Sequence, residues 1–416
     1  MKFHWFHGMP WPHLPADFRE RNRSVWVDAD SRLYDPVEGH RLYHEYLDQL
    51  EFAERVGFDG LVLNEHHQHV FGLMPSPQLM AAALARRTSR AAIILLGMSI
   101  ALYRPATRAA EEIAMLDVIS GGRIVAGFPL GTPMDTNFAY GANPAEFRRV
   151  YREHHDLILR AWQDPEVFAW NGESARLRYV NIWPRPIQQP HPPIWIPADG
   201  ISSETWDFCA ERGYAYVCLA SRGIAPAQAA MDGFWSRVET RGLPLNPYQG
   251  VVSQTIVVAE SDAEAQERYQ RHLDYSSRHT LRDFPGWSEA PGWRTERGIR
   301  ERAVRTMAEL AESAPPRIPT WQERIDSGSL AAGSPETVSE QLEHLVTSLR
   351  AGHLVGVFHV GDMPHDATLR STRLFAEQVI PRLRHLWDDY DDHWSPTPIA
   401  ADRLNRTTAR ELAGVN

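Results

Sequence analysis

Short apolar runs alternate with amphipathic segments along most of the chain. Runs such as Gly60–Leu63 and Ala215–Leu219 are apolar throughout, which is typical of strands covered on both faces. Between the runs, segments such as Asp35–Val56 place apolar residues at helical spacing. The pattern predicts eight strands, at Lys2–His7, Phe58–Leu63, Ala92–Ile100, Arg123–Phe128, Pro193–Pro197, Ala215–Leu219, Gly250–Ala259 and Leu354–Val360.

Helix start and stop signals fall between these strands. Gly57 follows one amphipathic segment where a left-handed C-terminal residue is needed, and Ser76-Pro77 has the residue types of a helix start. The predicted helices are Asp35–Val56, 76–88, Ala106–Ile119, Ala145–Trp162, Ser202–Arg212, Pro226–Arg241, Asp262–His279, 334–349 and 366–386.

Repeated strand–helix units favour a parallel sheet with right-handed crossovers, and eight such units predict a (β/α)8 TIM barrel. A doubly wound sheet is the alternative. It would normally carry a GxGxxG phosphate loop after the first strand, but Gly8–His13 reads GMPWPH. The barrel is therefore the preferred fold.

Two long segments interrupt the alternation. Residues 8–34 are rich in Pro, Trp and Arg, and the insertion 282–329, with an expected helix near Glu301–Glu312, carries several tryptophans. Long loops inside a compact domain are usually functional, so we expect both to cover a pocket. We predict a single barrel domain over residues 1–387 and a polar tail, loosely held or used in assembly, over residues 388–416.

Composition narrows the function classes. The formal net charge of −10 argues against a nucleic-acid partner. The chain has no run of about 18 apolar residues that would span a membrane, and no secretion signal is recognised. Its two cysteines, Cys209 and Cys218, form no CxxC pair, which is typical of a reducing cytoplasm.

Titratable residues crowd the segment that follows the second strand, Asn64–His69. Barrel enzymes keep their active sites in the loops after the strands. A metal site would need ligands at a recognised spacing, and only His67 and His69 could easily share an ion on an extended segment, so we expect no metal. An acid–base or hydrogen-bonding histidine is the stronger interpretation.

A second candidate lies after the fifth strand. Ser202, Ser203 and Thr205 open a helix, where hydroxyls and free backbone N–H groups can bind phosphate. An ordinary helix cap explains the same residues equally well. Arg148 and Arg149 begin another helix and could reach such a phosphate, or simply face solvent.

Three segments in this order resemble the bacterial luciferase-like flavin monooxygenases of the two-component, group C type: NEHHQHVFGLMPSP, RPATRAAEEIAMLDVISGGRIVAGFPLG and GSPETVSEQLEHLV. The resemblance extends over about residues 1–386. It implies a (β/α)8 barrel that binds FMN, reduced by a separate flavin reductase. With O2 this cofactor forms a flavin peroxide that oxygenates an organic substrate. The apolar, aromatic loops suggest a hydrophobic or aromatic small molecule.

The resemblance also assigns residues by position. His66 matches the catalytic histidine beside the flavin, and Ser99-Ile100 matches a non-proline cis peptide beneath the flavin ring. The hydroxyls of Ser202 and Thr205, with Ser203 between them, match the phosphate site, together with Arg148. One position departs from the pattern, because Leu130 stands where luciferase has a phosphate-binding arginine.

Two rival functions remain open from the sequence. Some enzymes of this fold use the deazaflavin F420 for hydride transfer without O2, and a non-catalytic flavin-binding barrel is a further alternative. The histidine segment favours FMN. Members of the family are usually oligomers, so we also expect a homo-oligomer.

Overall fold

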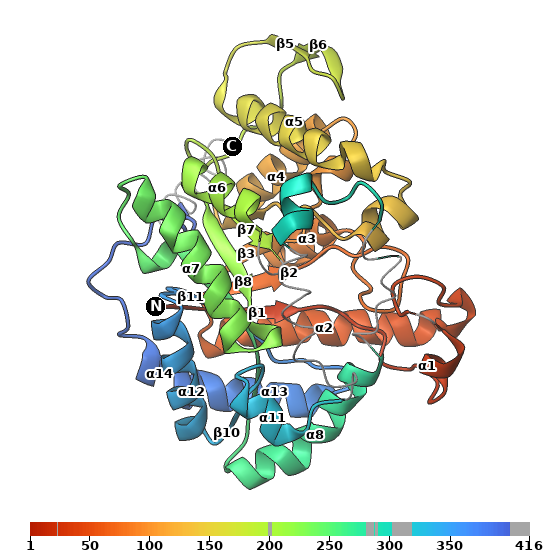
Figure 1. The fold of residues 1–416 in the computed structure, drawn as a ribbon, viewed down its shortest axis with the longest axis vertical. Coiled ribbons are helices and arrows are strands. Elements are labelled where there is room, and N and C mark those ends of the chain that lie inside the picture. The colour runs from red at the N-terminus through yellow and green to blue at the C-terminus, as the bar shows by residue number, and fades with distance from the viewer. Residues whose placement is uncertain (23, 199–201, 280–286, 288–289, 302–317, 400–416) are drawn as a thin grey trace, which may run out of the picture.

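Eight parallel strands close into a barrel in the computed structural model, which describes the chain except residues 23, 199–201, 280–286, 288–289, 302–317 and 400–416 (Figure 1). Each strand pairs with the next in the order β1-β2-β3-β4-β7-β8-β9-β11, and β11 pairs back onto β1. The barrel strands are β1 (Lys2–His7), β2 (Gly60–Leu63), β3 (Ala92–Leu96), β4 (Ile124–Gly127), β7 (Ile194–Ala198), β8 (Ala215–Leu219), β9 (Gly250–Val258) and β11 (His353–Val357). The predicted (β/α)8 barrel is confirmed.

Helices surround the barrel and connect its strands (Figure 1). They end where the sequence signals place them, for example at Gly57, whose φ of 110° requires the left-handed conformation that glycine adopts without strain. The main helices are α2 (Pro36–Val56), α3 (Pro77–Arg87), α4 (Thr107–Ser120), α5 (Pro144–Gln163), α6 (Ser203–Arg212), α7 (Ile224–Thr240), α8 (Asp262–His279), α12 (Pro335–Ser348), α13 (His365–Leu374) and α14 (Ile380–Leu383).

Several smaller elements were not predicted. An antiparallel hairpin of β5 (Phe168–Asn171) and β6 (Arg176–Val180) projects beyond α5, and β10 (Ala331–Gly333) pairs with the end of β9 (Figure 1). Short helices also occur, namely α1 (Phe18–Arg21), η1 (Ser31–Leu33), η2 (Ile100–Leu102), the π-helix η3 (Met134–Ala139), η4 (Ala220–Arg222), η5 (Pro247–Gln249), α11 (Trp321–Asp326) and the π-helix η6 (Phe375–Val379). The expected helix near 301–312 lies almost wholly outside the described residues.

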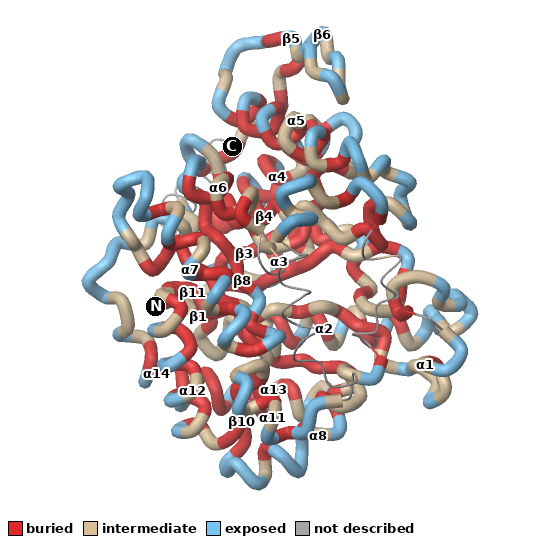
Figure 2. Tube along the Cα trace, in the orientation of Figure 1, coloured by how far each residue is buried: buried red, intermediate tan, exposed pale blue. Residues whose placement is uncertain are grey.

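The strands are buried on both faces, as their continuous apolar runs require (Figure 2). Val62, Ile94 and Val125 belong to the interior cluster of the barrel, whereas Leu61 and Ile93 pack against the surrounding helices. Burial of this kind stabilises by about 25 cal/mol per Å² of apolar surface. The rigid barrel then carries the loops that follow each strand.

The opposite, N-terminal end of the barrel is closed by the segment that follows α14. Trp394 accepts a hydrogen bond at its carbonyl from Trp195 and donates from its indole to Gly213. Farther along, Thr397 bonds to Gln188, and Ile399 donates to Gly121. The expectation of a loosely held tail is therefore wrong for residues 388–399, which form a strap across the barrel floor.

Cys209 and Cys218 are both buried, and they form no disulfide with each other. In the part of the chain that the structure describes, none of the helices has the length and apolar character needed to cross a bilayer.

Candidate active site

The loop after β2 is held tightly against the end of β3. Gly97 lies so close to this loop that an added Cβ would meet the Glu65 nitrogen at 2.3 Å and the Asn64 Cα at 2.6 Å. Only glycine permits such a backbone approach. A backbone bond from His66 to the Met74 carbonyl, 3.1 Å long, fixes the other side of the loop. The segment is therefore anchored at the mouth of the barrel.

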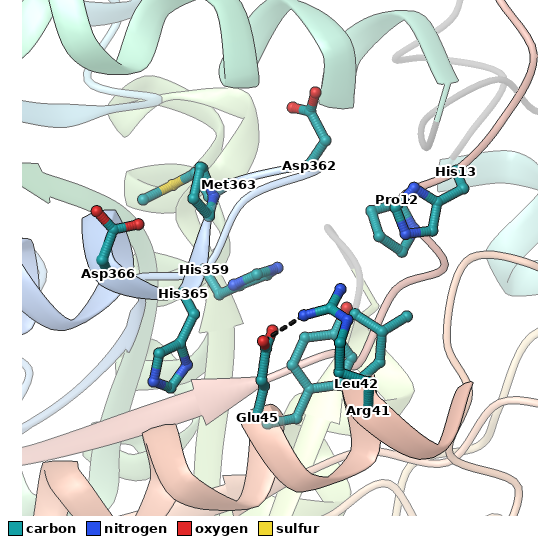
Figure 3. Close-up of a pocket in the computed structure, with 12 residues that line it drawn as sticks. Pro12, His13, Arg41, Leu42, Glu45, His359, Asp362, Met363, His365 and Asp366 are labelled. Atoms are coloured by element: carbon teal, nitrogen blue, oxygen red, sulfur yellow. Dashed lines mark hydrogen bonds and ion pairs between the residues drawn. The ribbon is translucent and has the colours of Figure 1, made fainter. Parts of the chain in front are cut away.

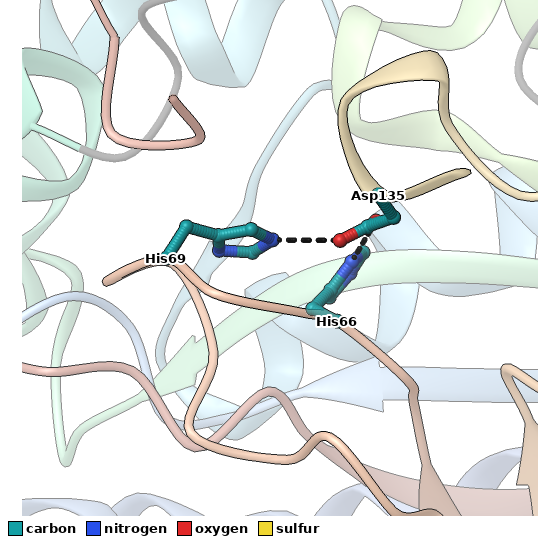
Figure 4. A group of neighbouring side chains, drawn as sticks. All are labelled: His66, His69 and Asp135. Atoms are coloured by element: carbon teal, nitrogen blue, oxygen red, sulfur yellow. Dashed lines mark hydrogen bonds and ion pairs between the residues drawn. The ribbon is translucent and has the colours of Figure 1, made fainter. Parts of the chain in front are cut away.

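Asp135, from the π-helix η3 after β4, gathers the histidines of this loop (Figure 4). His66 donates from Nδ1 to Asp135 Oδ2 over 2.9 Å, and His69 donates from Nε2 to Oδ1 over 3.0 Å. The His67 backbone N–H and the Thr132 hydroxyl supply two further bonds, of 2.8 and 2.9 Å. The carboxylate thus accepts four hydrogen bonds.

This arrangement bears on metal binding. His66, His69 and Asp135 place one ligand atom each within 4.8 Å of one another, a group that could hold a metal ion. The sequence-based view that only His67 and His69 could easily share an ion is wrong, because the loop turns between them at Gln68, whose φ is 59°, and His69 instead groups with His66. Hydrogen bonds already use the acceptor capacity of Asp135, so the geometry is explained without a metal.

The charge of the cluster resides on Asp135. Burial alone would raise the pKa of its carboxyl, but the hydrogen bonds and charges of His66 and His69 hold that pKa well below its usual range. For His69, burial dominates and lowers the pKa despite the bond to Asp135. An ionised carboxylate only accepts hydrogen bonds, which fixes the proton of His66 on Nδ1.

The Nε2 atom of His66 then faces away from Asp135. The His66 side chain is 16% exposed, whereas that of His69 is 0% exposed. Trp26 and Phe71 stack on each other, with ring centroids 4.1 Å apart, and both place a ring edge-on to His66. A small polar atom is thus presented beside an aromatic wall, an arrangement suited to hydrogen bonding in a partly dry environment.

A second chain of bonds orients the neighbouring residues. His67 Nε2 donates to Glu65 Oε1 over 2.8 Å, and the Tyr103 hydroxyl donates to Glu65 Oε2 over 2.7 Å. Burial raises the pKa of Glu65, against the lowering effect of His67 and Tyr103. The Tyr140 hydroxyl caps the other nitrogen of His67 at 3.2 Å. Glu65 and His67 therefore hold the loop in place. Both are buried, so neither presents an exposed edge as His66 does.

The segment Ser99-Ile100, after the third barrel strand, differs from the sequence-based expectation. Strand β3 ends at Leu96, and Ile100 begins the short helix η2. In the described residues every cis peptide bond precedes a proline, so the bond between Ser99 and Ile100 is trans. The expected cis bond is wrong here because Ser99, at φ −74° and ψ 81°, already turns the chain into η2. Ser99 Oγ donates to the Leu130 carbonyl over 3.2 Å, which ties β3 to the β4 loop.

The start of α6 brings together the predicted phosphate residues. Ser202 caps no backbone N–H with its side chain, and its hydroxyl lies 2.9 Å from that of Thr205. The Ser203 hydroxyl instead bonds to Glu301 of the insertion. Two hydroxyls at a helix N-terminus are donors suited to phosphate. Ser202 and Thr205 retain that arrangement, whereas Ser203 is engaged elsewhere.

Arg148 lies at the same place but is partly neutralised. Its guanidinium is 3.4 Å from Glu204 and donates to the Trp293 carbonyl over 3.1 Å. Glu204 also accepts a bond from Thr295. Arg149, in contrast, pairs with Glu173 at the surface and faces away from this site. Through Trp293 and Thr295, the insertion thus packs beside Arg148 and against the start of α6.

Sequence reasoning missed the residue that organises the site. Asp135 follows the fourth predicted strand and lies outside every motif recognised in the sequence. Its distance from His66 along the chain, 69 residues, leaves no local pattern that could reveal the contact. One general rule could have pointed to Asp135: polar residues in the loops after barrel strands meet at the mouth of the barrel.

Comparison with known proteins places this geometry in context. The family model for luciferase-like monooxygenases matches residues 26–351. Limonene 1,2-monooxygenase of Rhodococcus erythropolis is 31% identical over 362 residues, covering 86% of this chain and 84% of that protein.

Two solved structures share the fold. One is the oxygenating constituent of 3,6-diketocamphane monooxygenase from Pseudomonas putida in complex with FMN, with a TM-score of 0.67, 18% identity, and coverage of 92% of this chain and 98% of that one. The other is an F420-dependent secondary alcohol dehydrogenase, with a TM-score of 0.63, 16% identity, and coverage of 92% and 99%. The chain is an enzyme of the luciferase-like monooxygenase family.

Proposed function

We propose that this enzyme is a flavin-dependent monooxygenase that uses reduced FMN and O2 to oxygenate a small hydrophobic or aromatic molecule. The observation that carries the proposal is the His66–Asp135 pair at the barrel mouth, 2.9 Å apart, with the outward nitrogen of His66 beside Trp26 and Phe71. Family membership and the 31% identity to a limonene monooxygenase support the same reaction class.

The residues present fit a flavin phosphate at the start of α6. The hydroxyls of Ser202 and Thr205 and the free N–H groups of the first helical turn are donors, which phosphate oxygens require. Glu204 offsets Arg148 by an ion pair, and Leu130 supplies no charge. Binding would therefore depend on neutral donors, with Arg148 contributing once it is released from Glu204.

The flavin, when bound, would supply the electrons for O2 activation. Ser99 and Ile100 would lie beneath the flavin ring, held by the Ser99 bond to Leu130. His66 would hydrogen-bond to the reacting oxygen through Nε2, with Asp135 fixing its ring and the proton on Nδ1. Trp26 and Phe71 would exclude water from that position.

A reductase partner follows from the same proposal. The structural relative with FMN is named as an oxygenating constituent, which supports an arrangement in which reduced flavin arrives from a separate protein. We infer a transient flavin reductase as the partner.

Anaerobic titration of the purified protein with reduced FMN and with reduced F420 tests the cofactor. We expect saturable binding of reduced FMN at micromolar concentration and none of F420 at the same concentration. Subsequent addition of O2 and candidate substrates should give an oxygenated product with an atom from O2. Tight F420 binding with hydride transfer in the absence of O2 would support the alternative, and binding of flavin without turnover of any substrate would support a non-catalytic barrel.

A further inference from the structure

A cavity of about 480 Å³ lies beside the mouth of the barrel, between α2 and the loop that leads from β11 into α13 (Figure 3). Its size is within the range of small-molecule sites. The buried part of its lining consists of Leu42, Tyr46, His359 and Met363. It contains none of the residues of the His66 cluster or the α6 start.

His359 points into this cavity with an unused atom (Figure 3). The residue is 7% exposed, and its Nε2 has no hydrogen-bond partner among the described residues. Leaving a buried polar atom unpaired costs about 1–3 kcal/mol. In a cavity wall such an atom can form a hydrogen bond with a ligand.

The surrounding bonds favour the tautomer in which this atom is an acceptor. When the Thr368 hydroxyl donates its single proton to the Pro364 carbonyl, 3.2 Å away, its oxygen accepts from His359 Nδ1, also 3.2 Å away. Burial, with the charges of His272 and His365, lowers the pKa of His359 to about 3. The ring is therefore neutral near pH 7, with its proton on Nδ1 and a lone pair on Nε2.

The rest of the lining favours a positively charged donor. Three carboxylates line the cavity, those of Glu45, Asp362 and Asp366, against the guanidinium of Arg41. Glu45 pairs with Arg41, and Asp362 accepts from His272 Nδ1 over 2.7 Å, whereas Asp366 is exposed. The Tyr46 ring lies 5.3 Å from the His359 ring, so an aromatic surface adjoins the lone pair. A carboxylate excess and an aromatic ring both attract cations.

We propose that this cavity is a binding site for a small molecule with a protonated amine, whose N–H group donates to His359 Nε2. The site is separate from the flavin position proposed above and does not depend on that proposal. The Asp366 carboxylate balances the ammonium charge at the rim, and Tyr46 and Leu42 contact the apolar part of the ligand.

Calorimetric titration of the flavin-free protein at pH 7 with benzylamine, benzyl alcohol and benzoate tests the chemistry. These probes share a ring and differ in the donor and charge. We expect benzylamine to bind, benzyl alcohol to bind at least several-fold more weakly, and benzoate not to bind. Equal binding of the alcohol or benzoate, or no benzylamine binding at millimolar concentration, would overturn the proposal.

Two variants locate the site. His359→Phe keeps the ring but removes the lone pair, and should weaken benzylamine binding about tenfold or more. Asp366→Asn is an exposed change that leaves folding intact and should weaken it about twofold to threefold at low salt. The matched control is Asp232→Asn on α7, which removes the same charge outside the cavity. Thermal denaturation verifies folding, and unchanged binding in both His359→Phe and Asp366→Asn contradicts the assignment.

Discussion

The two ends of the barrel carry similar chemical groups with different surroundings. At the mouth, His66 and His69 share Asp135. At the floor, His4 Nε2 lies 3.0 Å from His353 Nδ1, and the other nitrogen of His353 lies 3.6 Å from Asp392. In both places burial would raise the pKa of the aspartate, and histidine partners hold that pKa below its usual range.

The two histidine–aspartate clusters differ in the solvent exposure of their histidine rings. The rings of His4 and His353 are enclosed by Trp195 and the strap that carries Asp392, and neither reaches solvent. At the mouth, His66 keeps an exposed edge beside Trp26. A buried histidine–aspartate pair is therefore insufficient evidence of catalysis, and the open ring edge is the distinguishing feature.

The largest expected effect comes from His66→Asn. Removing the outward nitrogen should lower the rate of product formation with chemically reduced FMN by about 10²-fold or more, the usual contribution of a positioned acid or base. Product yield per reduced flavin, measured by chromatography, provides the readout.

A variant at the floor of the barrel serves as the control for His66→Asn. His353→Asn should lower the melting temperature while leaving the rate per folded molecule unchanged, because no substrate can reach that ring. Full product yield from His66→Asn, or a catalytic defect in a folded His353→Asn protein, would remove the distinction between the two ends.

Asp135→Asn should have the next largest effect. The amide keeps the size of the side chain but replaces one acceptor oxygen with a donor, so one histidine bond is lost and the His66 ring is no longer fixed. We expect a fall in kcat of about tenfold to 10²-fold, with less than threefold change in the Kd for reduced FMN. A loss of flavin binding equal to the loss in kcat would indicate general damage to the fold and contradict a positioning role.

Much of the fold was predictable because each strand is buried on both faces. Continuous apolar runs such as Ala215–Leu219 have no helical periodicity, and glycines mark the ends of several helices. The hairpin Phe168–Val180 was missed because its exposed, Pro-flanked strands lack an apolar run. The strap over the floor was missed because its anchors are backbone and indole bonds, such as Trp394 to Gly213, which no local pattern encodes.

For the site, the position of Asn64–His69 directly after the second strand indicated the histidine segment. That position alone could not show which histidine faces the reaction. Helix-start chemistry indicated Ser202 and Thr205, whose hydroxyls lie 2.9 Å apart. The contact between His66 and Asp135 depends on the strand order, which places the β2 and β4 loops on either side of β3 at the same end of the barrel. The pairing of Arg148 with Glu204 likewise depends on the packing of α5 beside α6.

Trp394→Ala should affect stability alone. It removes the indole bond to Gly213 and the half-buried ring that closes the floor. We expect a loss of about 2 kcal/mol in the free energy of unfolding, less than for a fully buried tryptophan. Urea denaturation measures the loss, and the affinity for reduced FMN serves as the internal control. A change in flavin affinity would show that the two ends are coupled.

The smallest effect is electrostatic and concerns Asp392→Asn. The amide oxygen can still accept from the backbone of Trp394 and Ser395, so mainly the charge is lost. Because histidine contacts and hydrogen bonds lower the folded pKa of Asp392 despite its burial, its stabilisation is present above the unfolded pKa of about 3.9 and disappears as the pH falls through the folded pKa. Urea unfolding of both proteins should therefore show the largest difference near pH 7, about 1 kcal/mol, with convergence below about pH 4. A difference that grows with acidity would mean that the charge of Asp392 does not stabilise the strap.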